Sequence, residues 1–325
     1  MNEIADRVPS PDSAYGAVRG RVAWRMVNDR VLIRVFGADR ISFLHGMCSN
    51  DIRAMKTGEV APTLLLTDHA HVVADMFIYA DADAFLIEIE RSAWDRARAH
   101  LDRFLVADEV EFEQLEELAM LDLEGPRAAE LIAGLISQFN ELPPWRFAIA
   151  GGLRIANLPR LDWPALTIIG SQQEITELVR QLKDRGEIEA SDETLEAVRI
   201  EQGVARAGID TGERTLALEV RLERAISLNK GCYIGQETLE RATAHGALKK
   251  KLYGLRLPAG QIPPIGAPVK LAGREVGRIT STAQSPARGG IALAILHHDA
   301  WTPGTAVTVG EDGGLAAAVT DLPFE

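Results

Sequence analysis

The segment with the most chemical potential lies near residue 230, where two glycines enclose a Cys-Tyr pair. It reads Lys-Gly-Cys-Tyr-Ile-Gly-Gln-Glu from 230 to 237. A tight turn leading into a helix near Gln236 would place the Cys232 thiol beside Lys230 and a helix N-terminus, and nearby positive charge stabilises a thiolate. A small buried side chain in a turn fits the same residues. Residue chemistry alone leaves both interpretations open.

Two histidine pairs raise the question of a metal site. His69 and His71 lie in a predicted hairpin turn, where their spacing could place both on one face. No cysteine or carboxylate cluster completes that site in the sequence. His297 and His298 are adjacent at the end of a predicted strand, so we expect them to point to opposite faces. We therefore expect solvated histidines and assign no residue to a metal.

Several common catalytic motifs are absent from the sequence. It contains no Gly-x-x-x-x-Gly-Lys-Ser/Thr, Gly-x-Gly-x-x-Gly, Gly-x-Ser-x-Gly or His-Glu-x-x-His. These absences argue against phosphate-loop NTPases, Rossmann dehydrogenases, elbow-type serine hydrolases and zincins.

The elements that would position these residues begin after a polar start, expected to be ragged to about Tyr15. Residues 31–36 read as a strand, and 40–45 as a helix capped by Asp39 and closed by Gly46. Three short strands follow at 64–66, 72–79 and 85–89. Turn residues between them predict an antiparallel meander.

Two later segments share one plan, a strand followed by a capped helix. Strand 85–89 precedes a capping box from Ser92 to Asp95, and strand 166–169 precedes a better one from Ser171 to Glu174. The helices carry apolar stripes at Trp94, Ala97, Leu101 and Phe104, and at Ile175, Leu178, Val179 and Leu182. Recurring units of this kind predict an α+β architecture with two related halves.

The rest of the chain divides into helical and all-β regions. A strand at 118–123 and helices at 126–136 and 191–202 complete the first region. From about Lys251, prolines fall among short β-like runs without a helical period, which predicts a small all-β barrel or sandwich. We therefore expect two regions, 1–250 and 251–325.

Composition excludes several classes of protein. The 325 residues include 46% hydrophobic and 25% charged residues, values that exclude disorder, and the net charge of −12 argues against nucleic-acid and membrane-surface binding. The two cysteines, Cys48 and Cys232, suit a reducing compartment. The N-terminal residues resemble no signal or transit peptide, and no apolar run approaches the ~18 residues of a membrane span. We expect a cytoplasmic protein that contacts neither membranes nor nucleic acid directly.

Residues 230–237 resemble the signature of the YgfZ family, whose eukaryotic relatives are mitochondrial iron–sulfur assembly factors. That family is related to the folate-dependent aminomethyltransferase, or T-protein, of the glycine cleavage system, which keeps the Lys and Gly but usually lacks the Cys. The resemblance covers roughly residues 30–300 and includes 43–52, 64–79, 199–210 and 276–294. Two details depart from the pattern: Leu218-Glu219 lacks a preceding Pro, and Asp68 to His71 replace a turn that usually contains Gly.

The resemblance implies a GcvT-like fold. Two interleaved α+β lobes and a C-terminal β-barrel would surround a central channel that holds tetrahydrofolate or a derivative. The N–H edge of a pterin suits a carboxylate acceptor, for which Glu201 is the first candidate and Glu219 the second.

The remaining site residues follow from the same resemblance. Lys230, Arg241 or Arg199 could pair with the anionic folate tail, and Tyr233 would either stack on a ring or pack. Asp75 matches the T-protein aspartate that lies near folate N5 and assists the transfer; the alternative for Asp75 is an ordinary strand-end residue in solvent.

Two functions follow, with Cys232 and Asp75 as the residues closest to the chemistry. The first is a folate-binding accessory protein that supports assembly or repair of iron–sulfur enzymes, tRNA-modifying ones included. Its partners would be client enzymes or assembly factors, and two cysteines cannot supply four cluster ligands. The alternative is a tetrahydrofolate-dependent aminomethyltransferase or demethylase, with Asp75 as acid/base group. A third possibility is a protein of this fold that binds no folate.

Overall fold

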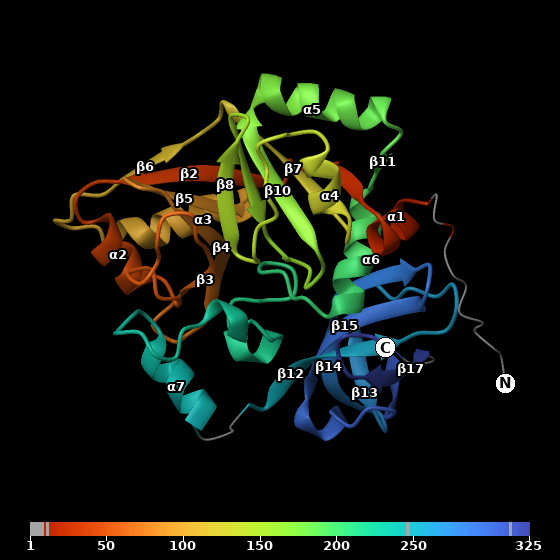
Figure 1. The fold of residues 1–325 in the computed structure, drawn as a ribbon. Coiled ribbons are helices and arrows are strands. Elements are labelled where there is room, and N and C mark those ends of the chain that lie inside the picture. Colours follow the sequence, from red (N-terminus) through yellow and green to blue (C-terminus); the bar gives the residue numbers. More distant parts are fainter. Residues whose placement is uncertain (1–9, 11–12, 245–247, 312–313) are drawn as a thin grey trace. The chain divides into compact units, whose positions relative to one another are not determined.

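The computed structural model describes residues 10, 13–244, 248–311 and 314–325 (Figure 1). It contains two compact units. The first, here called the two-sheet unit, comprises residues 17–190 and 224–238. The second, the barrel unit, comprises 1–16, 191–223 and 239–325. Helix α1 (Ala14–Gly20) contributes to both ranges. Among the described helices, none is long and apolar enough to cross a membrane.

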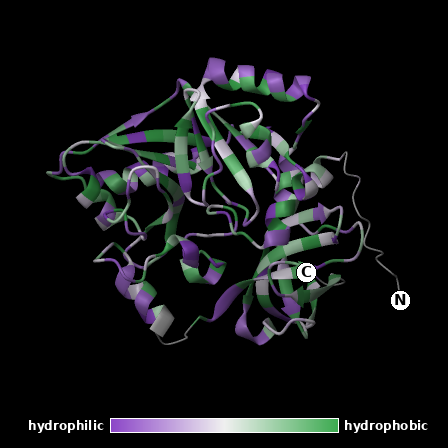
Figure 2. Cartoon of the chain, viewed as in Figure 1, coloured by the Kyte–Doolittle hydropathy of each residue, from purple (hydrophilic) through white to green (hydrophobic). Residues whose placement is uncertain are grey.

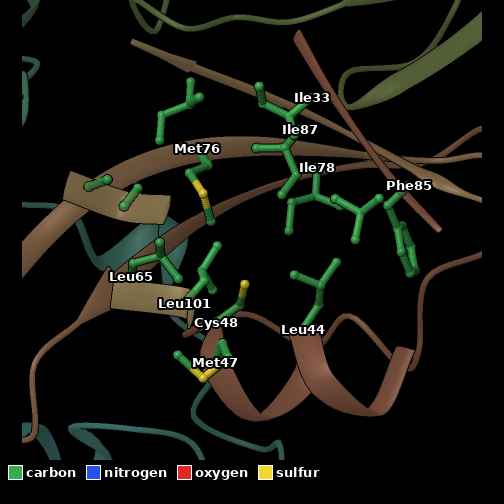
Figure 3. Close-up of a cluster of buried hydrophobic side chains, with 14 of the residues drawn as sticks. Ile33, Leu44, Met47, Cys48, Leu65, Met76, Ile78, Phe85, Ile87 and Leu101 are labelled. Atoms are coloured by element: carbon green, nitrogen blue, oxygen red, sulfur yellow. The ribbon is translucent and has the colours of Figure 1, made fainter. Parts of the chain in front are cut away.

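The first sheet of the two-sheet unit has the strand order β3-β4-β5-β2-β6. Its strands are β2 (Arg30–Phe36), β3 (Val60–Leu66), β4 (Val72–Ala80), β5 (Phe85–Glu90) and β6 (Glu111–Gln114). Neighbouring strands are antiparallel throughout, which confirms the predicted meander of β3, β4 and β5. Helices α2 (Arg40–Met47) and α3 (Arg91–Asp102) pack on one face through a core that includes Leu44, Met47 and Leu101 (Figure 3).

The second sheet has the order β11-β1-β7-β10-β9-β8. Its strands are β1 (Ala23–Met26), β7 (Leu118–Glu124), β8 (Arg146–Ala150), β9 (Leu153–Asn157), β10 (Ala165–Ser171) and β11 (Ile188–Glu189). Helices α4 (Ala128–Ala133) and α5 (Gln172–Asp184) cover it, and α5 turns a largely hydrophilic surface outward (Figure 2). Strand β1 precedes the whole first sheet in the sequence, so the two halves are interleaved, as the family resemblance implied.

The opposing faces of the two sheets pack on each other through an apolar layer and a group of buried charges. Leu32, Phe77 and Tyr79 of the first sheet contribute to the layer together with Met120 and Ile169 of the second. Within it, the Arg160 guanidinium donates to both oxygens of Glu88 at 2.6 and 2.7 Å and to both oxygens of Asp122 at 2.8 Å. One buried arginine therefore holds a carboxylate from each sheet.

The barrel unit is built on helix α6 (Asp192–Gln202) and a closed barrel of strand order β12-β15-β14-β13-β16-β17. The strands are β12 (Lys250–Arg256), β13 (Pro268–Leu271), β14 (Arg274–Ser285), β15 (Gly289–His297), β16 (Ala306–Val309) and β17 (Leu315–Thr320). Short helices η1 (Ala217–Val220) and η3 (His298–Ala300) lie in connections of this unit. Two further helices span the boundary between the units in sequence: η2 (Glu223–Ala225), and α7 (Gln236–Ala244), which begins at the end of the 230–237 segment. The all-β prediction for this region is confirmed.

The helix ends test the predicted caps. Ser171 and Glu174 form the expected capping box of α5. The predicted capping box from Ser92 to Asp95 was wrong, because α3 begins at Arg91 and Ser92 already lies inside the helix. Asp39 does not cap α2 with its side chain but accepts a hydrogen bond from the Glu109 N–H at 2.9 Å. Helix α2 also continues through Gly46 to Met47, and α4 is shorter than predicted.

Candidate functional site

Lys230 is buried against the C-terminal end of α2. Its Nζ donates to the carbonyl oxygens of His45 and Cys48 at 2.5 Å each and of Asn50 at 3.0 Å. The last carbonyls of a helix lack partners within the helix, and a cation there also interacts favourably with the helix dipole. Burial lowers the pKa of Lys230 to about 8, so the amine is still mainly protonated at neutral pH and uses all three protons.

Ser49 connects the same helix end to the segment before Lys230. Its hydroxyl donates to the Ala225 carbonyl at 2.6 Å and accepts from the Leu64 N–H of β3 at 2.9 Å. The Ser49 carbonyl also accepts from the Ser227 N–H at 3.0 Å. The residues leading into the 230–237 segment are therefore fixed to β3, which pairs with the strand that carries Asp75.

Asp75 lies on β4, opposite Leu64 of β3. Its side chain is half-buried, and within the described part of the chain its Oδ1 atom is buried without a hydrogen-bond partner. An unsatisfied buried acceptor costs about 1–3 kcal/mol, so such atoms usually have a partner that the chain itself does not provide. This acceptor is available for a contact with a ligand in the two-sheet unit.

The 230–237 segment packs against the turn between β3 and β4. Gly235 has φ +87°, and a Cβ there would lie 2.6 Å from the Thr67 carbonyl oxygen, so the position requires glycine. Gly231 differs, because its nearest neighbour to such a Cβ would be the His45 Nε2 atom at 3.7 Å. Tyr233 is buried and packs with its ring 4.7 Å from the Lys230 ammonium.

The two cysteines occupy opposite environments. Cys48 is completely buried among Leu44, Leu65 and Met76 (Figure 3), and burial raises the pKa of its thiol to about 12. Cys232 is exposed and free. The interpretation as a small buried side chain therefore applies to Cys48, and Cys232 is the accessible thiol.

The sequence did not indicate His45, whose imidazole lies next to Gly231 of the 230–237 segment. Its Nδ1 atom is 3.3 Å from Asp51 Oδ1 and accepts a long hydrogen bond from the Arg53 N–H. Burial and the Lys230 charge lower the pKa of His45, so the imidazole is neutral at pH 7. His45 lies in the stretch 43–52 that contributes to the family resemblance, but the resemblance gave this histidine no role.

In the barrel unit, Glu201 is 2% exposed and faces Tyr15 and Ser285. The Tyr15 hydroxyl lies 2.8 and 2.9 Å from its two carboxylate oxygens, and the Ser285 hydroxyl donates to Oε1. Tyr15 itself is buried within α1, which begins at Ala14, so the chain is already structured at this residue; most of the start that was expected to be ragged lies outside the described residues. The role of Glu201 toward a pterin stays a prediction.

Arg199, two residues earlier on α6, uses all five N–H donors within the barrel unit. It binds Glu196 twice, Asp210 at 2.7 Å, Ser281 at 2.7 Å and the Val204 carbonyl. A folate carboxylate would have to displace one of these partners.

The last two predicted residues lie elsewhere in the same unit. The Glu219 carboxylate accepts from the Leu216 N–H at 3.1 Å at the start of η1, and Arg241 is exposed on α7. Their proposed contacts with folate also stay predictions.

One of the two histidine pairs differs from expectation. His69 and His71 lie at the predicted hairpin turn, the first exposed and the second half-buried, with their rings 6.0 Å apart, and His69 contacts Asp68 at 2.7 Å. His297 and His298 do not point to opposite faces, since their rings are 4.0 Å apart. The prediction was wrong because His298 leaves the strand and begins η3.

Two family models and a solved structure match this chain. Residues 12–151 match the model of the GCVT N-terminal domain, and 250–324 match the glycine cleavage T-protein C-terminal barrel domain. The chain belongs to the GcvT-like superfamily. The crystal structure of aminomethyltransferase T from Bartonella henselae superposes with a TM-score of 0.87 at 21% identity, over 96% of this chain and 88% of that one. The GcvT-like fold expected from the sequence is confirmed.

GcvT-like relatives of this chain carry different names. An aminomethyltransferase of Thermus thermophilus is 28% identical over 89% of this chain and 83% of its own length. The tRNA-modifying protein YgfZ of Serratia proteamaculans is 25% identical over 92% and 91%. These similar identities do not distinguish an aminomethyltransferase from a YgfZ-type protein, so the distinction must rest on the residues of the candidate site.

Proposed function

We propose that this GcvT-like protein binds a reduced folate and supports the assembly or repair of iron–sulfur enzymes through Cys232. The observation that carries the proposal is the exposure of this thiol on a segment fixed by Lys230 and Gly235. Cys48, by contrast, is enclosed in the apolar core. A fixed segment with a free thiol suits contact with a second molecule.

The described residues fit a folate in the two-sheet unit better than in the barrel unit. A reduced pterin offers several N–H donors, and the buried Oδ1 of Asp75 is an acceptor without a donor. Glu201 and Arg199 already have partners within the barrel unit. We therefore assign Asp75 the main polar contact with the folate, and the contacts suggested for Glu201 and Arg199 stay predictions.

The thiol chemistry is limited by ligand number. One exposed cysteine cannot hold a cluster that needs four thiolates, so any iron or persulfide contact of Cys232 would be shared with a client or transient. The net charge of −12 disfavours direct RNA binding, so a link to tRNA modification would run through client enzymes.

The test of the thiol uses complementation of a strain that lacks the native gene. C232S replaces the thiol with a hydroxyl of similar size, and the matched control is L228S, which changes a 64% exposed residue just before the 230–237 segment. We expect C232S to lose the support of iron–sulfur client activity and L228S to retain it. Full client activity with C232S would remove the thiol role.

Folate binding is tested separately by titration calorimetry with tetrahydrofolate. D75N keeps the size of the side chain and removes the carboxylate, so we expect binding to wild type and at least ~tenfold weaker binding to D75N, about one charge-assisted hydrogen bond. No binding to wild type at millimolar tetrahydrofolate would favour a protein of this fold without the ligand.

The second candidate is a tetrahydrofolate-dependent aminomethyltransferase or demethylase, and the Asp75 carboxylate is the observation that favours it. A half-buried carboxylate with a free acceptor suits an acid/base or electrostatic role next to a bound folate. Incubation with an aminomethylated lipoyl carrier and tetrahydrofolate distinguishes the candidates. Turnover to methylene-tetrahydrofolate that D75N abolishes and C232S retains would favour the enzyme.

A further inference from the structure

The corner where strand β15 ends brings three potential metal ligands together. His297 is the last residue of β15, and His298 and Asp299 begin η3. The Nδ1 atom of His297 lies 3.3 Å from Asp299 Oδ2, and that of His298 lies 3.0 Å from Asp299 Oδ1. One ligand atom from each residue lies within 4.8 Å of the others.

The backbone holds this corner in place. The His298 N–H donates to the Lys249 carbonyl at 3.0 Å, and the Trp301 indole donates to the Leu296 carbonyl at 2.8 Å. The two histidine rings therefore stay on the same side of the barrel because the chain turns between them, and the carboxylate follows in the same turn.

The spacing fits a small tetrahedral ion. Bonds of ~2.0–2.2 Å place neighbouring ligand atoms of a tetrahedral zinc site roughly 3.3–3.6 Å apart. The two separations from Asp299 oxygens, 3.3 and 3.0 Å, are already close to this value. We propose that His297, His298 and Asp299 bind a divalent transition-metal ion such as Zn²⁺ or Ni²⁺, with water in the remaining position. Two imidazoles favour such ions over Mg²⁺ or Ca²⁺.

Two cations oppose the bound ion and give the proposal a sharp test. Arg274 donates to Asp299, and Lys250 lies opposite His297 in the pairing of β12 with β15. The Arg274 side chain is 65% exposed, so it can leave the carboxylate without disturbing the core. If the ion binds here, removing the Arg274 charge should tighten binding; a site elsewhere would not respond.

The hairpin histidines provide an internal control. His69 and His71 are also near a carboxylate, yet their rings are 6.0 Å apart, and this group does not meet the same ligand spacing among the described residues. H69A and H298A remove equivalent exposed imidazoles. Only the second should weaken the binding of the ion.

The experiment is calorimetric titration of the full chain with ZnCl₂ and, separately, NiCl₂, in a C232S background that removes the accessible thiol. We expect one equivalent of ion, at least ~tenfold weaker binding in H298A and in D299N, and unchanged binding in H69A. R274A should bind roughly three- to tenfold more tightly, the range for removing a unit charge near a divalent ion in water.

Each contrary outcome overturns the proposal. These are absence of saturable binding in the C232S protein, equal affinity in H298A, loss of binding in H69A, or unchanged or weaker binding in R274A. Circular dichroism checks that each variant is folded, and the His298 imidazole is 53% exposed, so its truncation leaves no buried cavity. The proposal is independent of folate binding and of the Cys232 thiol.

Discussion

Replacing Lys230 by methionine should destabilise the two-sheet unit. Methionine keeps most of the apolar stem of the side chain and removes the ammonium, so the change isolates the three hydrogen bonds to the end of α2. The carbonyls of His45 and Cys48 then lose a donor at 2.5 Å each, and that of Asn50 loses one at 3.0 Å. Lys230 is 7% exposed, so water replaces the lost donors poorly.

The magnitude follows from two opposing contributions. Three hydrogen bonds from a charged donor contribute about 2 kcal/mol each, or roughly 6 kcal/mol in total. Burial of the ammonium offsets part of this gain. A pKa lowered from 10.5 to about 8 corresponds to about 3 kcal/mol at 1.36 kcal/mol per unit. The expected loss in the free energy of unfolding is therefore about 3 kcal/mol.

The assay is urea unfolding of wild type and K230M, monitored by tryptophan fluorescence and circular dichroism at pH 7. The control is N229A, which changes an exposed neighbour and should alter stability by less than ~0.5 kcal/mol. A loss below ~1 kcal/mol in K230M would refute the reasoning, because it would mean that burial cancels the three hydrogen bonds. K230M should also loosen the segment and increase the rate of Cys232 alkylation, whereas N229A should not.

Three further predictions concern the two-sheet unit. Burial and the Asp122 charge raise the pKa of Glu124 to about 8, so the folded protein binds more protons than the unfolded chain between about pH 4.5 and 8. The free energy of unfolding of wild type should therefore fall by a few kcal/mol relative to that of E124Q as pH rises through this window. Urea unfolding at several pH values measures the difference, and a difference that does not change with pH would contradict the prediction. G235A should lower the free energy of unfolding by at least ~2 kcal/mol and G231A by much less, because only the first substitution places a Cβ against backbone at positive φ. Equal losses in urea unfolding would show that the contact with the Thr67 carbonyl is not what requires glycine at 235. R160M removes the guanidinium that bridges the buried carboxylates of Glu88 and Asp122, which keep Arg30 and Arg25 as cationic partners, and should cost about 3–5 kcal/mol by the same measurement. A neutral effect would show that these remaining partners are sufficient.

Local sequence patterns predicted the meander, the capped helix α5 and the all-β character of the C-terminal region, because each of these depends on residues close in the chain. Ser171 and Glu174 lie three residues apart, and their capping box needs no tertiary contact. The short edge strands β6 and β11 were missed, since their few residues pair with distant partners and carry little periodic signal. The interleaving of the halves came from family resemblance rather than from pattern.

In the candidate site too, the local motif could be predicted from the sequence, whereas contacts with distant residues could not. The sequence motif indicated that Lys230, Cys232 and Gly235 belong together, but not that Lys230 would bind carbonyls about 180 residues earlier. The environment of Asp75 and the exposure of Cys232 depend on packing between distant segments. His298 was misjudged for a local reason, because one residue of 3₁₀ helix after a strand reverses the direction of a side chain.

The interleaved second sheet has a consequence for how the chain emerges during synthesis. The first sheet is complete once residues 30–114 are available, whereas the second needs β1 near residue 23 and β11 near residue 188. The nascent β1 must therefore wait, unpaired, while more than ninety residues are made before its partner β7 appears. A fragment that ends at residue 151 would hold β1 and β7 without β10 or the covering α5, leaving an apolar strand edge open to association between copies.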